Sequence, residues 1–182
     1  MHTTGHCASY GRQYTDFLTL AEVKVFGQAV AWGDDVALGK SASQSSTFAD
    51  AAASYAVDGD TNGQWLHGSL ACTTSEPQPW WEVDLGQLYD LDALEIWNRT
   101  DCAPERLDDF YIFVSDVPFT ANTVAETLAQ GDVWHRHIVG VPAPDMQVLV
   151  DTVGRYVRIQ LADTDFLTLA EVKVFGHPLL TS

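Results

Sequence analysis

The stretch Leu91-Asp-Ala-Leu-Glu-Ile-Trp-Asn-Arg-Thr-Asp-Cys-Ala-Pro-Glu-Arg106 joins an alternating, mostly apolar run to a segment that carries two arginines. The run 91–97 is typical of a β-strand. Pro104 interrupts the segment that follows, so Arg99 and Arg106 are predicted to lie on a loop. Each guanidinium is a planar set of N–H donors that stays charged, and two of them on one loop suit a ligand rich in oxygen. Asp101 lies between them and can hold one guanidinium in place, although a salt-bridged surface loop has the same pattern.

The remainder of the chain indicates an all-β fold. Residues 80–85 alternate between two sets of side chains, as a strand with one buried face does. Residues 49–55, rich in alanine, could form one short helix, and further strands are expected at residues 110–114, 133–139, 146–150, 156–161 and 167–175. Short strands parted by turns predict a β-sandwich or jelly roll, in which functional loops gather at one end. The two-arginine loop follows a strand end and is so placed.

The composition limits the class of partner. The chain has 182 residues, of which 46% are apolar, so it can build one domain with a substantial core. Its 25 acidic residues outnumber nine Lys and Arg and give a net charge of −16. This charge repels nucleic acid and anionic membrane surfaces, but it is compatible with neutral sugars and a bound divalent cation. No apolar run approaches the ~18 residues of a membrane-spanning helix, so no membrane insertion is expected.

One internal repeat is present. Residues 15–27 and 164–176 both read TDFLTLAEVKVFG. Identity over this length indicates a duplication, and its separation is too long for a solenoid repeat. We therefore expect four parts: the tail of an upstream copy of the domain (1–27), a linker (28–35), the complete domain (36–176) and a C-terminal tail (177–182).

The segment Asp58-Gly-Asp-Thr-Asn-Gly63 matches the first half of an EF-hand loop. An EF-hand is excluded because its twelfth position, which must be a bidentate glutamate, is Ser69 here. Two interpretations stay open. The segment either helps to hold a cation through Asp58, loop carbonyls and an acid from elsewhere, or it is a plain turn without an ion.

Other polar and aromatic groups give weaker signals. His135 and His137 would share one strand face, but no third metal ligand lies nearby in the sequence, so a solvated or hydrogen-bonded pair is favoured. Glu82 and Asp84 form a polar strand face without a glycosidase's second carboxylate at a recognisable place. No G-x-S-x-G, phosphate loop or H-E-x-x-H is present, so no enzyme activity is expected. Trp65 is a candidate platform for the apolar face of a sugar.

Together, these motifs resemble the F-type lectins, or fucolectins. The resemblance runs from about residue 36 to 176 and rests on segments in a fixed order: Ala56-Val-Asp-Gly59, His67-Gly-Ser69, Pro79-Trp-Trp-Glu-Val-Asp-Leu85, Asn98-Arg-Thr-Asp-Cys102 with Glu105-Arg106, Gly154-Arg-Tyr-Val157 and Ala170-Glu-Val172. It implies a discoidin-like jelly-roll β-sandwich that binds terminal α-L-fucose on glycans and carries a structural calcium ion. We accordingly expect an extracellular or secreted protein, although residues 1–6 show no signal peptide.

The resemblance implies roles for particular residues. Arg99, Asp101 and Arg106 match the family pattern R-x-D-x4-R/K and would form the sugar site, with Trp65 in the aromatic cluster that receives the C6 methyl group. The implied calcium ligands are the Asp58 carboxylate, the main-chain carbonyls of Tyr55 and Asp60, Ser69 and Glu171.

Two departures from the family pattern concern cysteine. Cys72 occupies the position of the motif histidine, and Cys102 is followed by Ala103 where many members have a second cysteine that forms a vicinal disulfide. Both positions would line the sugar pocket. We therefore hypothesise a Cys72–Cys102 disulfide that replaces the vicinal one and leaves Cys7 unpaired, with free thiols as the alternative.

The leading hypothesis is a non-enzymatic, fucose-binding lectin module. Two alternatives stay open: a discoidin-like adhesion module with a degenerate sugar site, and a carbohydrate-binding appendage of a larger glycosidase.

Overall fold

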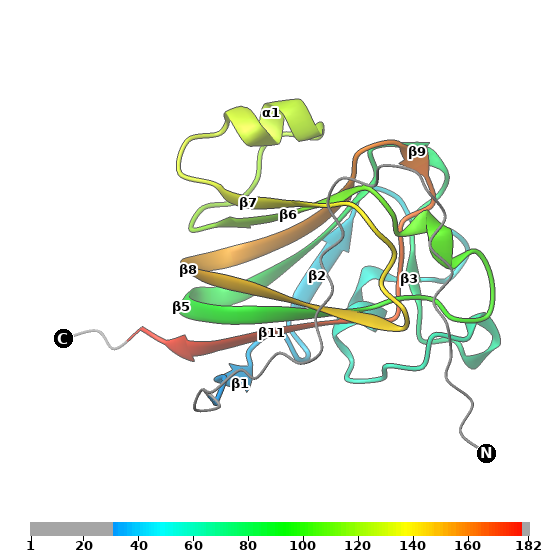
Figure 1. Ribbon diagram of the computed structural model, residues 1–182, viewed down its shortest axis with the longest axis horizontal. Helices are drawn as coiled ribbons and strands as arrows, with labels where there is room; N and C mark the ends of the chain where they lie inside the picture. Colours follow the sequence, from blue (N-terminus) through cyan, green and yellow to red (C-terminus); the bar gives the residue numbers. More distant parts are fainter. Residues whose placement is uncertain (1–30, 180–182) are drawn as a thin grey trace, which may run out of the picture. The chain divides into compact units, whose positions relative to one another are not determined.

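The computed structural model describes residues 31–179, and strands make up most of its regular structure (Figure 1). The strands are β1 (Asp34–Asp35), β2 (Ser41–Gln44), β3 (Ala71–Cys72), β4 (Glu76–Pro77), β5 (Trp80–Trp97), β6 (Phe110–Ser115), β7 (Trp134–Ile138), β8 (Asp145–Leu161), β9 (Thr164–Asp165), β10 (Thr168–Leu169) and β11 (Glu171–Pro178). The helical turns of this part of the chain are α1 (Val124–Ala129) and the 3-10 turns η1 (Ala53–Val57), η2 (Trp65–His67) and η3 (Pro104–Arg106). The all-β class expected from the sequence is confirmed.

The two longest strands, β5 and β8, organise the fold. The sequence indicates two separate strands in each of these regions, whereas the structure joins them into one. Where the two predicted strands meet in β5, the pairing register with β8 shifts between Asp84 and Tyr89. Gly86 lies in this break with a φ of 88°, which glycine adopts without steric cost. The irregularity bends the ladder and does not end it.

The bend divides each long strand between two facing layers. In one layer β2 pairs with residues 81–84 of β5, and β6 pairs with residues 156–161 of β8 and carries the edge strand β7. In the other layer β11 pairs with residues 89–97 of β5, beside residues 145–154 of β8. Figure 1 shows β5 and β8 as long ribbons that run through the whole sandwich. This is the jelly-roll β-sandwich predicted from the sequence.

The core lies between the layers and takes its side chains from alternate positions. Trp81, Val83 and Leu85 are buried while their neighbours in β5 are partly exposed, which confirms the alternation predicted for this stretch. Leu94 and Ile96, in the second half of β5, are fully buried as well. Each side chain of this size contributes about 1.5–3 kcal/mol when it leaves water. The core therefore fixes the strand ends from which the functional loops start.

The helical segments differ from the sequence-based expectation. The sequence predicts a helix over residues 49–55, but only η1 forms there, because Ala49 has a φ of 51° and starts a tight turn. The sequence does not indicate α1. This helix begins after Thr123, whose side chain accepts a hydrogen bond from the Glu126 amide as an N-cap does.

The ends of the domain also reach further than the sequence suggests. β1, which falls in the expected linker, pairs with Phe175 and Gly176 of β11. β11 continues to Pro178, inside the expected C-terminal tail. The expected remnant of an upstream repeat, residues 1–27, lies outside the described residues.

Candidate functional site

A pocket of about 240 Å³ lies among the loops at one end of the sandwich. It brings together residues from six separate segments of the chain: Phe48 after β2, Trp65 in η2, Cys72 in β3, Arg99 after β5, Arg106 in η3 and Phe166 before β10. Four of these, Trp65, Cys72, Arg99 and Arg106, are sugar-site residues predicted from the sequence. Their roles in binding stay a prediction.

Arg99 is held from two sides. Its Nε donates to Asp101 Oδ1 at 2.6 Å, and its guanidinium lies over the Trp65 ring at 5.0 Å from the ring centre. Asp101 Oδ2 also accepts from the Trp65 amide at 3.2 Å. The hydrogen bond from Arg99 is the main reason why the pKa of Asp101 is lowered. Within residues 31–179 the terminal nitrogens of Arg99 have no protein acceptor, so they are available to a ligand.

Arg106, the second arginine in the lining of the pocket, is held in a similar way. Its guanidinium lies over the Phe166 ring at 4.6 Å, and its Nε is 3.6 Å from Asp165 Oδ1. Phe166 in turn meets Phe48 edge to face at 5.5 Å, and Phe48 lies 5.8 Å from Trp65. Both arginines are therefore backed by aromatic rings, which keeps their donors in fixed positions.

Sequence reasoning missed Phe48 and Phe166. Each is a single aromatic residue in a loop without a local motif around it. Phe166 lies inside the repeated thirteen-residue sequence, directly before the strand expected at residues 167–175. Nothing in the sequence pairs it with Phe48.

The arginine loop is tied to the loop of residues 58–63. The Gly63 carbonyl accepts from the Thr100 amide at 2.8 Å. A Cβ at Gly63 would lie 2.6 Å from the Asn98 carbonyl oxygen, so the close approach of the two loops requires glycine. Asn98 is buried and donates to the carbonyls of Pro104 and Pro142. These contacts fix the start of the segment that carries both arginines.

The hypothesis of a Cys72–Cys102 disulfide is wrong, because both cysteines are free thiols. Cys72 is buried, and its Sγ lies 3.3 Å from both the Thr73 carbonyl and Thr168 Oγ1. Burial raises the pKa of the Cys72 thiol above its ordinary value. Cys102 is exposed on the arginine loop and is absent from the lining of the pocket.

Three of the five predicted calcium ligands, Asp58, Ser69 and Glu171, make side-chain hydrogen bonds in the region of Gly59. Asp58 Oδ2 accepts from Ser69 Oγ at 2.6 Å, and Glu171 Oε1 accepts from the Gly59 amide at 3.1 Å. The Asp60 carboxylate is engaged by His67 at 2.6 Å. Residues 31–179 contain no cluster of three or more acidic, histidine or cysteine side chains arranged for a metal, so a cation here would depend on main-chain carbonyls, as the prediction for Tyr55 and Asp60 requires.

Glu171 is the unusual member of this group. It is fully buried, and its Oε2 has no hydrogen-bond partner in the described part of the chain. Burial, with the nearby charges of Asp58 and Asp35, raises the pKa of Glu171 to about 8. A buried carboxylate oxygen without a partner is costly, and a bound cation would remove that cost. The donor set therefore fits a calcium ion.

The other candidates of the sequence have structural partners. Glu82 and Asp84 pair with Arg158 and Arg155, which confirms the polar strand face expected there. His137 bonds the Asp109 carboxylate, in keeping with the hydrogen-bonded pair favoured from the sequence.

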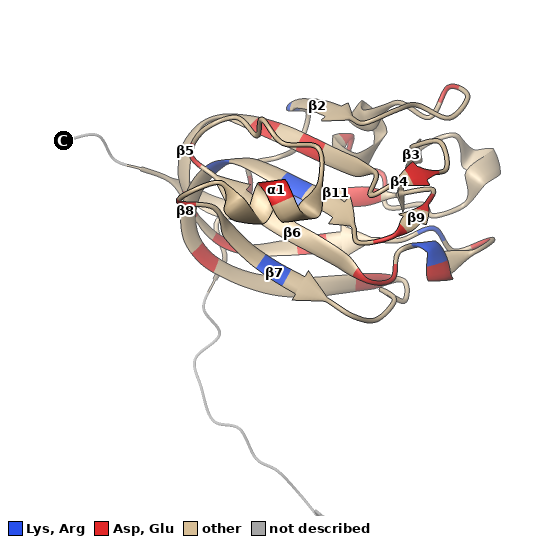
Figure 2. Ribbon diagram, turned by 90° about the horizontal axis from the view of Figure 1, so that it is seen from above, with Lys and Arg blue, Asp and Glu red and all other residues tan. Residues whose placement is uncertain are grey.

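Acidic positions are spread over the sandwich, whereas basic ones are few (Figure 2). Figure 2 shows one of the basic segments among the loops near β9. No helix within residues 31–179 has the length and apolar character to cross a membrane.

Comparison with known proteins agrees with this fold. The model of the NedA-like, galactose-binding domain family matches residues 55–159. Fucolectin-1 of Anguilla japonica is 34% identical over 126 residues, which are 66% of this chain and 65% of that protein, so the chain spans just under two thirds of its length. Fucolectin-4 of the same species is 34% identical over 153 residues, 78% of this chain and 79% of that protein. A solved fucose binding module of Streptococcus pneumoniae, SpX-3, superposes with a TM-score of 0.69 at 33% identity over 80% of this chain and 99% of that one.

The fold and the family model thus define a galactose-binding-like domain of the discoidin type. More particularly, the chain belongs to the fucolectin, or F-type lectin, family. The resemblance seen in the sequence is confirmed.

Proposed function

We propose that the described domain is a lectin module that binds terminal α-L-fucose on glycans and catalyses no reaction. The observation that carries this proposal is one pocket that combines two guanidinium groups with three aromatic rings. Fucose needs both kinds of group, because its hydroxyl and ring oxygens accept hydrogen bonds while its C–H faces and methyl group need apolar contact. The similarity to fucolectins and to a fucose binding module supports this ligand.

In this proposal Arg99 and Arg106 are the principal donors to the sugar. Asp101 orients Arg99, and charged donors of fixed geometry make stronger hydrogen bonds than neutral ones. Trp65 forms the apolar wall, together with the two phenylalanines that the sequence analysis missed. Cys72 contributes an apolar surface where the family has a histidine, at the cost of one hydrogen bond to the sugar.

We also propose a structural calcium ion held by Asp58, Ser69, Glu171 and the carbonyls of Tyr55 and Asp60. When bound, the ion would neutralise the buried Glu171 carboxylate and link the start of β11 to the loop of residues 58–63. The support for this site is the buried, unpartnered Glu171 Oε2. The ion would have no contact with the sugar.

The absence of catalysis follows from the chemistry proposed for the pocket. Hydrolysis of a glycosidic bond ordinarily requires two carboxyl groups on either side of it. The residues that line the pocket include no Asp or Glu, and nearby Asp101 is bonded to Arg99.

Calorimetric titration with methyl α-L-fucoside tests the proposal. The unaltered protein should bind, while Arg99→Ala and Arg106→Ala should abolish detectable binding and keep the circular dichroism spectrum. Arg136→Ala is the matched control, since Arg136 lies on β7 outside the pocket. Methyl α-L-galactoside, which differs by a hydroxyl on C6, should bind about tenfold or more weakly because that hydroxyl enters an apolar wall.

Two results would contradict the proposal. Unchanged fucoside binding by both arginine variants would remove the arginines from the site. No fucoside binding by the unaltered protein would favour the adhesion module with a degenerate sugar site.

A further inference from the structure

The loop of residues 58–63 ends in a pair of residues that is open to a spontaneous chemical change. Asn62 is followed by Gly63, and it is the one asparagine of the chain that precedes a glycine. In such a pair the main-chain nitrogen of the glycine can attack the amide carbon of the asparagine side chain, because glycine has no Cβ to shield that nitrogen.

The structure leaves both reacting groups of this pair without protein partners. Among the described residues, neither the Gly63 amide nor Asn62 Nδ2 donates to an acceptor. Asn62 is half-buried, so water reaches it. Its Oδ1 accepts from the Gln64 amide at 3.0 Å, which folds the side chain back over the Gly63 peptide. The same donor would stabilise the negative charge that develops on Oδ1 when the amide carbon is attacked.

The packing of the loops keeps glycine at residue 63. A Cβ there would lie 2.6 Å from the Asn98 carbonyl oxygen and 2.9 Å from the Thr100 amide nitrogen. A side chain at this position, which would slow the attack, is therefore excluded. The close approach that joins the two loops leaves the Asn62 amide group beside an unshielded main-chain nitrogen.

The other two asparagines of the chain are better protected. Asn98 is buried, and its amide group donates to the carbonyls of Pro104 and Pro142. Asn122 is exposed, but the β-branched Thr123 follows it and shields the next main-chain nitrogen. Both are internal references for the reactivity of Asn62.

We propose that Asn62 is a site of spontaneous deamidation that ends sugar binding by the domain. The Gly63 nitrogen gives its proton to solvent base and bonds to Asn62 Cγ. The bond between Cγ and Nδ2 breaks, and Nδ2 leaves as ammonia after it takes a proton from water. Water then opens the succinimide ring. Opening at Cγ gives aspartate, and opening at the main-chain carbonyl gives isoaspartate, in which the main chain runs through Cβ and Cγ.

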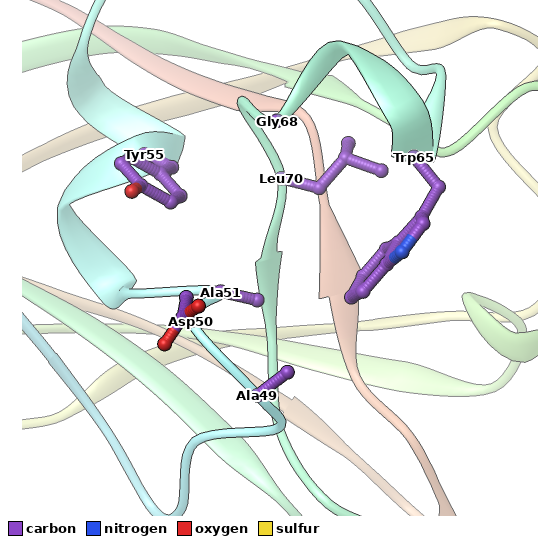
Figure 3. A pocket seen from close by; sticks show the side chains of 7 residues that line it. All are labelled: Ala49, Asp50, Ala51, Tyr55, Trp65, Gly68 and Leu70. Atoms are coloured by element: carbon purple, nitrogen blue, oxygen red, sulfur yellow. The ribbon is translucent and has the colours of Figure 1, made fainter.

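Isoaspartate would disrupt the support of the arginine pocket, the pocket lined by Arg99 and Arg106. It adds one carbon atom to the main chain directly before Gly63, whose carbonyl accepts from the Thr100 amide at 2.8 Å and which has no room to move toward the arginine loop. Trp65 follows on η2, and Figure 3 shows its ring projecting from that turn. Because Gly63 contacts the arginine loop and leads into Trp65, both walls of the pocket should shift. The loss of binding rests on the proposed fucose site, whereas the deamidation does not.

Mass spectrometry of the aged full chain tests the modification. After incubation at mildly alkaline pH and physiological temperature, the peptide that contains Asn62 should show conversion of amide to acid, and isoaspartyl methyltransferase should label it. Asn98 and Asn122 should still be unchanged. Asn62→Ser is the matched control and should give neither signal, because serine has no amide group while its hydroxyl can still accept from the Gln64 amide.

Calorimetry of the same samples tests the consequence. The fraction of protein that binds methyl α-L-fucoside should fall in step with the fraction of isoaspartate at residue 62, and Asn62→Ser should keep its capacity over the same time. Freshly purified Asn62→Asp separates charge from chain length. It carries the added charge on a normal main chain and should bind the fucoside as the unaltered protein does.

The outcomes separate the proposals. An aged protein in which Asn62 is intact, or in which Asn98 or Asn122 reacts first, overturns the deamidation site. Isoaspartate at residue 62 with full fucoside binding overturns its effect on the sugar site. Fresh protein that does not bind the fucoside overturns the proposed fucose site and leaves the deamidation site standing.

Discussion

At the scale of single residues, the contacts of Arg99 suit arginine better than lysine. Its Nε donates a hydrogen bond to Asp101 and its guanidinium lies over the Trp65 ring, and in the proposed sugar site its terminal nitrogens donate to the ligand. Its side chain is only 14% exposed. Lysine cannot make the three contacts together, because its ammonium is a compact charge without a planar face.

We therefore expect Arg99→Lys to lower the affinity for methyl α-L-fucoside by about tenfold or more, which corresponds to about 1.4 kcal/mol. The melting temperature should change little. Arg136→Lys is the control, since Arg136 also lies over a tryptophan, Trp134, at 5.6 Å but outside the pocket. Calorimetry checks the result, and equal affinity for Arg99→Lys and the unaltered protein would show that charge alone suffices.

Cys72 gives a prediction for the pH dependence of binding. Burial raises the pKa of its thiol above the ordinary value of 9.0, so it stays neutral at physiological pH. The pKa of Asp101 is lowered, chiefly by the Arg99 hydrogen bond. The ion pair between Asp101 and Arg99 is therefore fully formed above pH 3.8, the ordinary pKa of an aspartate carboxyl. It is lost only as the pH falls through the lower pKa that Asp101 has in the folded protein.

The fucoside affinity should consequently be constant between pH 5 and 8 when calcium is saturating. Titrations at pH 5, 6, 7 and 8 check this. A midpoint between pH 6 and 7 would reveal a histidine in the binding step, which the lining of the pocket does not contain.

At the scale of elements, the start of β11 and the loop of residues 58–63 depend on each other. Glu171, the first residue of β11, accepts from the Gly59 amide, and Gly63 at the end of that loop contacts Thr100. The loop then leads into Trp65, which lines the arginine pocket. In the proposed function, a cation at Glu171 would thus stabilise the loop of residues 58–63, which leads into the sugar site, without contacting the sugar itself.

Removing calcium should lower the melting temperature by about 5–10 °C, because saturation at 100 times Kd stabilises by about 2.7 kcal/mol. Scanning calorimetry with calcium and with chelator measures this shift. Magnesium, which prefers a smaller octahedral site, should not replace calcium.

Glu171→Gln is the matched variant for this test. It should lose the response to calcium, yet in chelator at neutral pH it should be about as stable as the unaltered protein, because the raised pKa of about 8 already keeps most of the Glu171 carboxyl uncharged, as glutamine is. A melting temperature that ignores chelator in the unaltered protein would contradict the site.

At the scale of the whole molecule, the described domain contains its own core. Every buried apolar side chain of the described residues lies between Ala37 and Val174, and the described residues, 31–179, belong to one compact unit. Only one copy of the repeated thirteen-residue sequence can pair with β5 at the β11 position, and residues 171–176 occupy it.

Deleting residues 1–27 should therefore leave a soluble monomer with unchanged affinity for methyl α-L-fucoside. Size-exclusion chromatography and calorimetry of the shortened and full chains make the comparison. An insoluble product, or a loss of affinity, would show that the N-terminal copy is integral to the domain.

The sequence by itself determined the features that arise over a few residues. The period of two over residues 80–85 decides which face of β5 is buried, since successive side chains of a strand point to opposite sides. Pro104 and the preceding strand place Arg99 and Arg106 on one loop. The order of motifs indicated the family.

Only the tertiary structure decided which distant residues meet. Phe48 and Phe166 join the arginine pocket through the packing of loops from separate strands, which no local period encodes. The state of Cys72 was likewise decided by the structure: it is a free, buried thiol whose Sγ lies 3.3 Å from Thr168 Oγ1 on the neighbouring strand. Glu171 is implied as a calcium ligand by the family resemblance, but only the structure shows that its carboxylate is buried and close to the charge of Asp58. Contacts of this kind depend on the register of strands far apart in the chain, and that register is set by packing of the whole core.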